Sequence, residues 1–394
     1  MIFTANKKAL HQIMAQAALC VSENPAQPYL CGIHLEAKAN GIVTCTGSDH
    51  EMAVQASGPA AIVQVGAAVF DSRLIPEIVR KMPTDEVSIE TVNNDNQVVL
   101  RSGSCVMQVA CLPAKGYKMP DLPFPESMMS VQGLPALLRK VGFAAATGQN
   151  DKPMLKGVSL AFSDSGLTAT ACDGYRVAES RGDEECKGNL SIMVPIRAVQ
   201  RLVRLSSDDS VYQLGMTAKS IVFWDGSMLF TTRALEGETL DTVAILSKHP
   251  EKYRVLTTAE GLAQAVGVAS VGEQSVCLRM QDSGLLLSSG TQIPDYKDDD
   301  IRLLAAYRGT GQSEIRVPAQ VMVPSEKPFY YNGQKLLQNL QAMTGQVALL
   351  FCERGHVMIV SQHMRIFQMA AAAPKARATP KPKAVEKKKL PEAA

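Results

Sequence analysis

The sequence lacks the features of an exported, membrane-bound or metal-binding protein. Its nine cysteines are odd in number and never form a CxxC pair, so neither a disulfide framework nor a zinc site is predicted, and no metal or cofactor is expected. No segment approaches the roughly 20 apolar residues of a membrane-spanning helix. The opening MIFTANKKALHQIM has no long apolar run and no small-residue cleavage site. We therefore expect a cytoplasmic protein with no membrane partner.

Catalytic motifs are also missing. The chain has no Walker lysine loop, HExxH, GxSxG or dinucleotide-binding glycine pattern, and its six histidines show no metal-ligand spacing. Asp173 precedes Arg176 by three residues, which is more typical of an aspartate that closes a strand turn and pairs locally than of an acid–base site. The sequence predicts no catalytic residue, and the protein is expected not to be an enzyme.

Charge is unevenly distributed along the chain. Charged residues make up 20% and apolar residues 46% of the 394 positions, which is ordinary for a globular chain of two or three domains. From Pro374 onward, seven basic and two acidic residues give +5, so the total of +2 leaves −3 for the rest. A nucleic-acid ligand would therefore have to meet locally concentrated positive charge.

The most informative feature is an internal repeat. The segments YLCGIHLEAKANGIVTCTGSDHEMAV and MLKGVSLAFSDSGLTATACDGYRVAE share a Leu-x-Gly-aliphatic-x-Leu start, a turn, an alternating strand and a later aspartate. Their glycines, Gly32 and Gly157, are 125 positions apart. A weaker third copy, SVCLRMQDSGLLLSSGTQ, begins at Ser275 and turns at Asp282-Ser283-Gly284. Such a long period predicts tandem structural units.

The second half of each unit repeats as well. Segments beginning at Asp71, Val194 and Tyr331 each read as a helix, a polar turn and three short strands. The predicted fold class is α+β, with each unit placing two helices against antiparallel sheets. Proline-rich stretches divide the chain into predicted domains 1–124, 125–250 and 251–370, and the Ala/Pro/Lys-rich tail 371–394 is predicted to be disordered.

Several predicted helices carry a basic face. In the helix that follows Pro195, one stripe is apolar while Arg197, Arg201 and Arg204 recur on another face, and Arg73 and Arg80 are placed similarly near Ser72. Ordinary solvation of helix surfaces remains the alternative. If equivalent helices line one surface, that surface suits phosphate contacts without base readout, because no helix-turn-helix, zinc-finger or RRM motif is present.

Short motifs indicate a family. The stretches TGSDHEM at 46–52 and TACDGYRVA at 170–178, together with Tyr331-Asn332-Gly333 and Met364-Arg365, resemble the bacterial DNA polymerase III β sliding clamp over nearly the whole of 1–370. The resemblance implies three tandem clamp domains that form half of a closed ring, with helices inside and sheets outside. It implies a head-to-tail homodimer around double-stranded DNA, a replication processivity factor that tethers DNA polymerase, the clamp loader and repair proteins.

The resemblance also implies three sets of site residues. The first is a pocket for short hydrophobic peptides between the second and third domains, formed by Leu155, Cys172, Gly174, Tyr175, Arg176, Val177, Val360, Met364 and Arg365. The second is a DNA-binding set formed by Asn24, Arg73, Arg80, Gln149, Asn150, Lys152, Arg197, Arg201 and Arg204. The third is a dimer-interface strand with Met107 and Val109. The alternative to these site roles is that the apolar residues pack in the core and the polar residues lie in solvated turns.

Two segments depart from the family pattern. The last strand reads Gln362-His363-Met364-Arg365 and about 25 residues follow it, and Leu240-Asp241-Thr242-Val243 replaces a Pro-Asp-Tyr run. Because both changes affect the implied peptide pocket, a divergent or secondary clamp serving a repair polymerase is an alternative. Two further alternatives are a protein-binding scaffold that does not encircle DNA and a DNA-processing enzyme with an unrecognised site.

Overall fold

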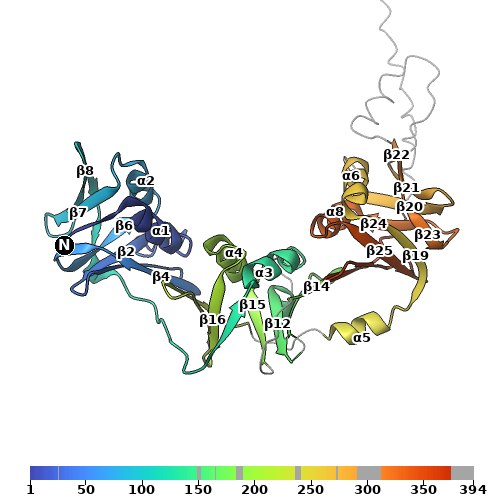
Figure 1. The fold of residues 1–394 in the computed structure, drawn as a ribbon, viewed down its shortest axis with the longest axis horizontal. Coiled ribbons are helices and arrows are strands. Elements are labelled where there is room, and N and C mark those ends of the chain that lie inside the picture. The colour runs from blue at the N-terminus through green and yellow to red at the C-terminus, as the bar shows by residue number, and fades with distance from the viewer. Residues whose placement is uncertain are drawn as a thin grey trace, which may run out of the picture. The chain divides into compact units, whose positions relative to one another are not determined.

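The chain forms two compact units, Met1–Asp241 and Thr242–Ala394. The computed structural model describes residues 1–24, 26–148, 152–164, 166–182, 190–235, 241–271, 274–290 and 312–373 (Figure 1). In these ranges, no helix combines the length and apolar character needed to cross a membrane. The predicted domain boundaries at 124, 250 and 370 stay predictions.

The first unit begins with one complete copy of the repeat. Its elements are β1 Ile2–Asn6, α1 Lys7–Ala18, β2 Gly32–Lys38, β3 Ile42–Ser48, β4 Met52–Pro59, β5 Ala61–Gln64, β6 Gly66–Asp71, α2 Leu74–Lys81, β7 Glu86–Val92, β8 Gln97–Ser102, β9 Cys105–Ala110, β10 Leu112–Pro113 and the 3-10 turn η1 Ala114–Gly116. Asn6 fixes the start of α1, because its side chain accepts hydrogen bonds from the N–H groups of Lys8 and Ala9. Helix α1 buries one stripe against α2 and against strands β2 to β4.

The second copy follows in the same order within this unit. Its elements are β11 Met128–Gln132, α3 Leu134–Gly142, η2 Pro153–Leu155, β12 Gly157–Ser163, β13 Gly166–Cys172, β14 Arg176–Arg181, β15 Leu190–Pro195, α4 Ile196–Leu205, β16 Val211–Met216, β17 Ser220–Trp224 and β18 Met228–Arg233. Helices α3 and α4 pack together as α1 and α2 do (Figure 1). The predicted apolar stripe of α4 is confirmed for Ile196, Val199 and Leu202, which are buried, and Val203 is half-buried.

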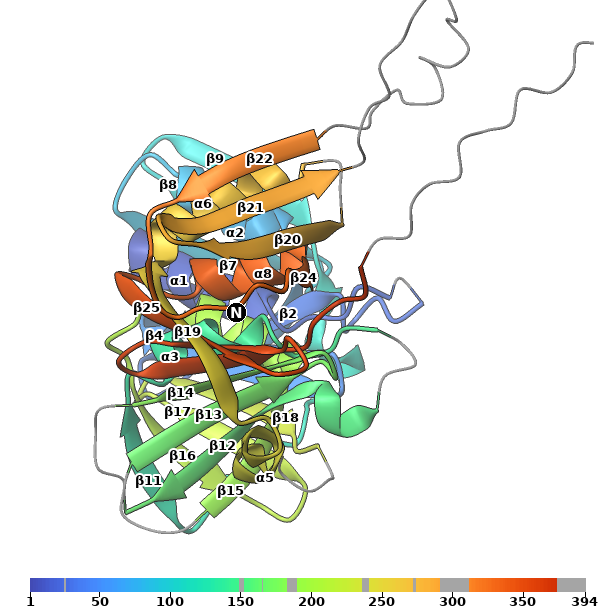
Figure 2. The same cartoon turned by 90° about the vertical axis from the view of Figure 1, so that its right-hand side faces the viewer.

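The second unit contains the third copy. Its elements are α5 Thr242–Ser247, β19 Glu251–Thr258, α6 Ala259–Ala269, β20 Ser275–Gln281, β21 Gly284–Gly290, β22 Gln312–Val317, β23 Gln320–Val323, β24 Phe329–Asn332, α8 Gly333–Gln341, β25 Gln346–Cys352, β26 Val357–Val360 and β27 Met364–Gln368. The predicted turn at Asp282-Ser283-Gly284 is confirmed, since Gln281 pairs with Gly284 where β20 returns as β21. Helix α6 packs on α8 and lies beside β21 and β22 (Figure 2).

All described strand pairs are antiparallel. The first unit has a five-stranded sheet in the order β5-β1-β7-β8-β9 and a nine-stranded sheet in the order β10-β6-β2-β3-β4-β18-β17-β16-β11. In the same unit β12 lies between β15 and β13, and β13 pairs with β14. In the second unit β22-β21-β20-β24 form one set, and β23, β19, β25, β26 and β27 pair in series. The predicted α+β class is confirmed.

One strand pair joins the first two repeats, and we call it the β4–β18 seam. The last strand of the second repeat, β18, pairs with the fourth strand of the first repeat, β4, from Met228 opposite Ala56 to Thr232 opposite Met52. The first two repeats therefore share one continuous sheet. Strand β18 is the third strand after the second helix of its repeat, and the corresponding strand of the first repeat is β9; the strand of the third repeat that corresponds to β4 is β22. Within the described residues, each of these two strands lies at the end of its sheet.

Candidate functional sites

A tight turn between β13 and β14 positions the first half of the predicted peptide pocket. Asp173 Oδ1 accepts hydrogen bonds from the backbone N–H groups of Tyr175 and Arg176, at 2.9 and 3.0 Å. Gly174 takes the left-handed backbone conformation, with φ of 86°, which glycine adopts without a steric cost. Asp173 therefore closes the turn, as the sequence predicts.

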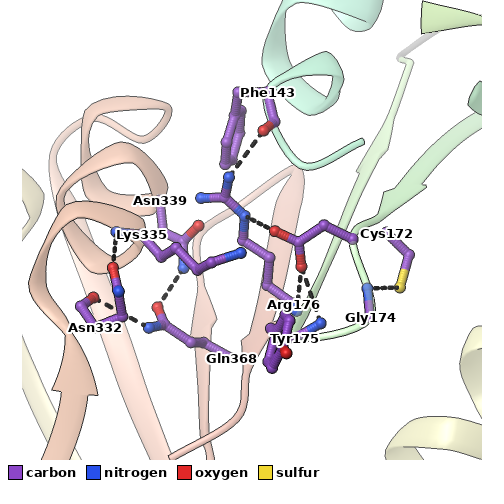
Figure 3. A network of polar contacts seen from close by, with 10 residues as sticks. Phe143, Cys172, Gly174, Tyr175, Arg176, Asn332, Lys335, Asn339 and Gln368 are labelled. Atoms are coloured by element: carbon purple, nitrogen blue, oxygen red, sulfur yellow. Dashed lines mark hydrogen bonds and ion pairs between the residues drawn. The ribbon is translucent and has the colours of Figure 1, made fainter. Parts of the chain in front are cut away.

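The Arg176 side chain is buried, with 5% of its surface exposed. Its guanidinium donates to Asp173 Oδ2 at 3.2 Å and to the carbonyl oxygen of Phe143 at 2.9 Å, and lies 4.9 Å from the centre of the Phe143 ring (Figure 3). Burial lowers the pKa of Arg176, and the neighbouring Asp173 opposes that shift. These contacts give Arg176 a structural role, holding the turn against the end of α3.

Other predicted pocket residues of the first unit gather at the same turn. Cys172 is buried and its sulfur accepts a hydrogen bond from the Gly174 N–H at 3.2 Å. Leu155, at the end of η2, lies close enough to contact a side chain at position 174, since its Cδ1 would be 3.8 Å from a Cβ built there. Val177 is buried, whereas Tyr175 exposes 64% of its surface. An exposed aromatic ring beside a buried apolar wall suits contact with a peptide.

The remaining three pocket residues belong to the second unit. Val360 ends β26, Met364 begins β27 and is buried, and Arg365 follows it and is half-buried. Sequence reasoning missed a buried polar chain nearby in this unit. Asn339 Nδ2 donates to Gln368 Oε1 at 2.6 Å, and Gln368 Nε2 reaches the carbonyl oxygen of Asn332 at 3.5 Å (Figure 3). These bonds tie α8 to the last strand, and the only sequence signal was an asparagine within an apolar helical stripe.

The predicted DNA-binding arginines fall into two groups, those that form ion pairs with the protein's own carboxylates and those that do not. Arg80 makes two hydrogen bonds to Glu77, which hold the pKa of that carboxyl down at about 2. Arg197 pairs with Glu51 at 2.8 Å and Asp49 at 3.2 Å. The charges of these two arginines are therefore partly neutralised where they stand.

The other arginines of the predicted DNA-binding set remain available. Arg73, Arg201 and Arg204 form no ion pair with any residue in the described ranges. In the loops, Lys152 is exposed, and the Asn24 side chain accepts a hydrogen bond from the Ala26 N–H at 3.0 Å. Gln149 and Asn150 lie outside the described residues.

Strand β9 carries the predicted interface residues. It lies at the end of the five-stranded sheet with β8 as its only described neighbour. Val106 and Met107 expose 61% and 40% of their surfaces, and Val109 is half-buried. An edge strand with exposed apolar side chains is a site of strand addition.

The candidate metal ligands and the cysteines are dispersed in the described part of the chain. No three His, Cys, Asp or Glu side chains there come together as metal ligands. The eight described cysteines are free thiols, six of them buried, and burial raises the pKa of Cys20 to about 12.

Comparison with known proteins identifies the class. Among solved structures, the sliding clamp of Bacillus subtilis matches 95% of this chain and 100% of its own, with a TM-score of 0.82 and 22% identity. The DNA polymerase III beta subunit of Thermotoga maritima matches the same shares, with a TM-score of 0.80 and 18% identity. The fold is that of a DNA polymerase sliding clamp.

Sequence comparison gives the family. Residues 1–122 match the model of the N-terminal domain of the DNA polymerase III beta subunit, and residues 129–241 match that of its central domain. The beta sliding clamp of Bacillus subtilis is 29% identical over 286 residues, covering 69% of this chain and 74% of its own. That of Staphylococcus epidermidis is 27% identical over 267 residues, covering 65% and 69%. The chain belongs to the DNA polymerase III beta subunit family.

Proposed function

We propose that this protein is a DNA sliding clamp: its copies pair head to tail into a dimeric ring that encloses duplex DNA and tethers polymerase, clamp loader and repair proteins. Its activity is topological rather than catalytic. A closed ring cannot leave DNA sideways, so retention does not require tight or sequence-specific binding.

The observation that carries the proposal is the β4–β18 seam. The chain already joins two repeats by pairing the last strand of one with the fourth strand of another. The same two positions in the repeat, β9 and β22, are sheet ends within the described residues. Pairing β9 of one copy with β22 of the next would repeat the seam between copies. Such a head-to-tail contact produces a closed ring when the rotation per copy closes, and it covers the open edges of β9 and β22.

Positive charge on the helices supports duplex DNA as the enclosed ligand. Arg201 and Arg204 on α4 and Arg73 just before α2 carry charges that no described acidic residue pairs with. Phosphate contacts of this kind supply affinity without sequence readout. Arg80 and Arg197 contribute less to this proposal, because carboxylates already bind them.

The turn at Asp173 supports peptide capture as the means of tethering. The exposed Tyr175 belongs to this turn, Leu155 lies close to Gly174, and the buried Val177 follows two residues after Tyr175. A rigid apolar wall with a few polar groups is typical of sites that bind short hydrophobic peptides. That Val360, Met364 and Arg365 complete the same pocket stays a prediction.

The test is retention on DNA circles. The protein would be loaded onto a nicked circular plasmid with the clamp loader of its host and ATP, and free protein removed by gel filtration. We expect co-elution with the circle and release once a restriction enzyme linearises it. Equal retention on circular and linear DNA would indicate an ordinary DNA-binding protein. No retention on either form would indicate a scaffold that does not encircle DNA.

A further inference from the structure

The first unit contains a cavity of about 580 Å³ at the β4–β18 seam. We call it the seam cavity. Its walls come from the turn between β3 and β4, the connection 118–121, residues 218–220 at the start of β17, and residues 231–234 at the end of β18. The volume lies within the range of sites that hold small molecules or several residues of a peptide.

One wall of the seam cavity is a second copy of the Asp173 turn. Asp49 Oδ1 accepts hydrogen bonds from the N–H groups of Glu51 and Met52, at 3.0 and 2.8 Å. His50 takes the left-handed conformation with φ of 73°, where the other turn has Gly174 at 86°. The repeat therefore builds the same kind of wall twice within the first unit.

The two walls differ in the residue that follows the turn. Met52, buried to 3% exposure, stands where the other copy has Arg176. Among the described residues, no buried guanidinium anchors this turn. Arg197 on α4 holds it from the second repeat instead, through Asp49 and Glu51. The seam cavity thus has an apolar floor in Met52 and Ala53, and a turn that is fixed from both repeats.

Three cations surround this floor. Lys118, Lys219 and Arg233 are exposed, and none forms an ion pair within the described ranges. They come from three segments, two of which, 218–220 and 231–234, also pair with each other in the second repeat. Of the two carboxylates in the lining, Glu51 is already paired with Arg197, and Asp121 is exposed. The lining therefore carries an excess of positive charge that no described protein group neutralises.

We propose that the seam cavity binds a short acidic peptide segment of a partner protein. Carboxylates of the peptide would meet Lys118, Lys219 and Arg233, and its apolar side chains would contact the exposed Met119 and the Met52 floor. A peptide also offers N–H donors to Asp121 and apolar side chains to Met119, whereas a phosphate backbone offers neither. This balance favours a peptide over a nucleic acid. The proposal is independent of both DNA encirclement and the Asp173 pocket.

The probe is an array of fluorescein-labelled octapeptides, each with two or three Asp or Glu residues and one Leu or Met. A matched array replaces every carboxylate with its amide. We expect selected acidic peptides to bind the full-length protein at low salt and their amide partners to bind at least about tenfold more weakly. Affinity should fall as salt rises, because rim charges are screened. Equal binding of acids and amides would overturn the proposal.

Variants locate the binding site. Lys219→Ala should weaken binding about two- to fivefold, as expected for one partly exposed ion pair. Reversing Lys118, Lys219 and Arg233 together to Glu should abolish it. Lys115→Glu is the control, since Lys115 is exposed on η1 and does not line the cavity. Unchanged binding by the triple variant, or an equal loss with Lys115→Glu, would overturn the proposal. Thermal unfolding would verify that each variant is folded.

A spectroscopic readout separates the possible ligands. With methionine methyl groups labelled with carbon-13, the acidic peptides should shift the resonances of Met119 and Met52 and leave that of the buried Met14, which does not line the cavity, unchanged. Pyrophosphate and a short duplex oligonucleotide are added in parallel. If either shifts Met119 while the acidic peptides do not, the cavity is a phosphate or nucleic-acid site and the peptide proposal fails.

Discussion

Gly47 in β3 lies directly against the backbone carbonyl group of Ala17 in the last turn of α1. A Cβ atom built on Gly47 would stand 2.0 Å from the Ala17 oxygen and 2.8 Å from its carbonyl carbon. That oxygen accepts the N–H of Cys20, so it is already engaged at the end of the helix. The contact lets α1 approach the sheet more closely than any residue with a side chain would permit.

Gly47→Ala is therefore expected to be destabilising. The helix end must move, because backbone atoms cannot rotate away, and overpacking of this kind costs about 1–3 kcal/mol. Chemical denaturation followed by circular dichroism would measure the free energy of unfolding. Gly58→Ala in β4 is the control, since its Cβ would meet Ile13 at 3.7 Å, an ordinary contact. Equal effects of the two changes would contradict this account.

Arg176→Ala tests whether the buried arginine holds the β13–β14 turn. It removes the guanidinium that pairs with Asp173, whose side chain is 9% exposed, and breaking a buried ion pair costs about 3–5 kcal/mol. The first unit should unfold at a lower denaturant concentration. Arg204→Ala on α4 should change stability by less than about 0.5 kcal/mol, because that side chain is exposed and forms no ion pair within the described ranges. A similar small loss for both variants would remove the structural role from Arg176.

Met107→Lys tests the proposed pairing of β9 with another copy. A lysine at this position would be buried without a partner in the interface, so the dimer dissociation constant should rise at least about tenfold. Sedimentation velocity across a dilution series would measure it. Val63→Lys is the matched control, since Val63 is 77% exposed on β5, the opposite edge of the same sheet. If only Val63→Lys dissociated the dimer, the contact between copies would lie on β5 rather than on β9.

The lowered pKa of His356 predicts that the stability of the second unit depends on pH. Its Nδ1 accepts the N–H of Ala370 at 2.9 Å, and burial, with His249 nearby, lowers the pKa of His356 below 6.5. The folded state thus binds this proton less readily than the unfolded chain does. The resulting stabilisation is present above pH 6.5 and is lost as the pH falls below that value and through the folded-state pKa.

Thermal unfolding at pH 7.5 and 5.5 would measure this effect. The wild-type protein should lose stability at the lower pH, and His356→Asn, which cannot titrate, should lose less. The other histidines are common to both proteins, so the difference between them isolates His356. An identical pH dependence would show that the imidazole contributes nothing.

Sequence reasoning succeeded where the signal is local or repeated. The α4 stripe follows from 3.6-residue spacing, and the turn at Asp173 follows from an aspartate three residues before Arg176. It failed where partners are distant in sequence. Nothing near Arg197 indicates that Asp49 and Glu51 bind it, and the Asn339–Gln368 bond needs the folded unit. The pairing of Glu77 with Arg80, by contrast, was readable as an i,i+3 pair on one helix.

The β4–β18 seam also fixes how far one repeat is displaced along the next. Five residues of each strand are matched, from Met228 opposite Ala56 to Thr232 opposite Met52. A slip by one residue would shift the second repeat by about 3.3 Å and invert which side chains face the core. Buried Met52, Val54 and Phe230 oppose such a slip. Hydrophobic alternation in two short strands thereby sets the spacing between the first two repeats.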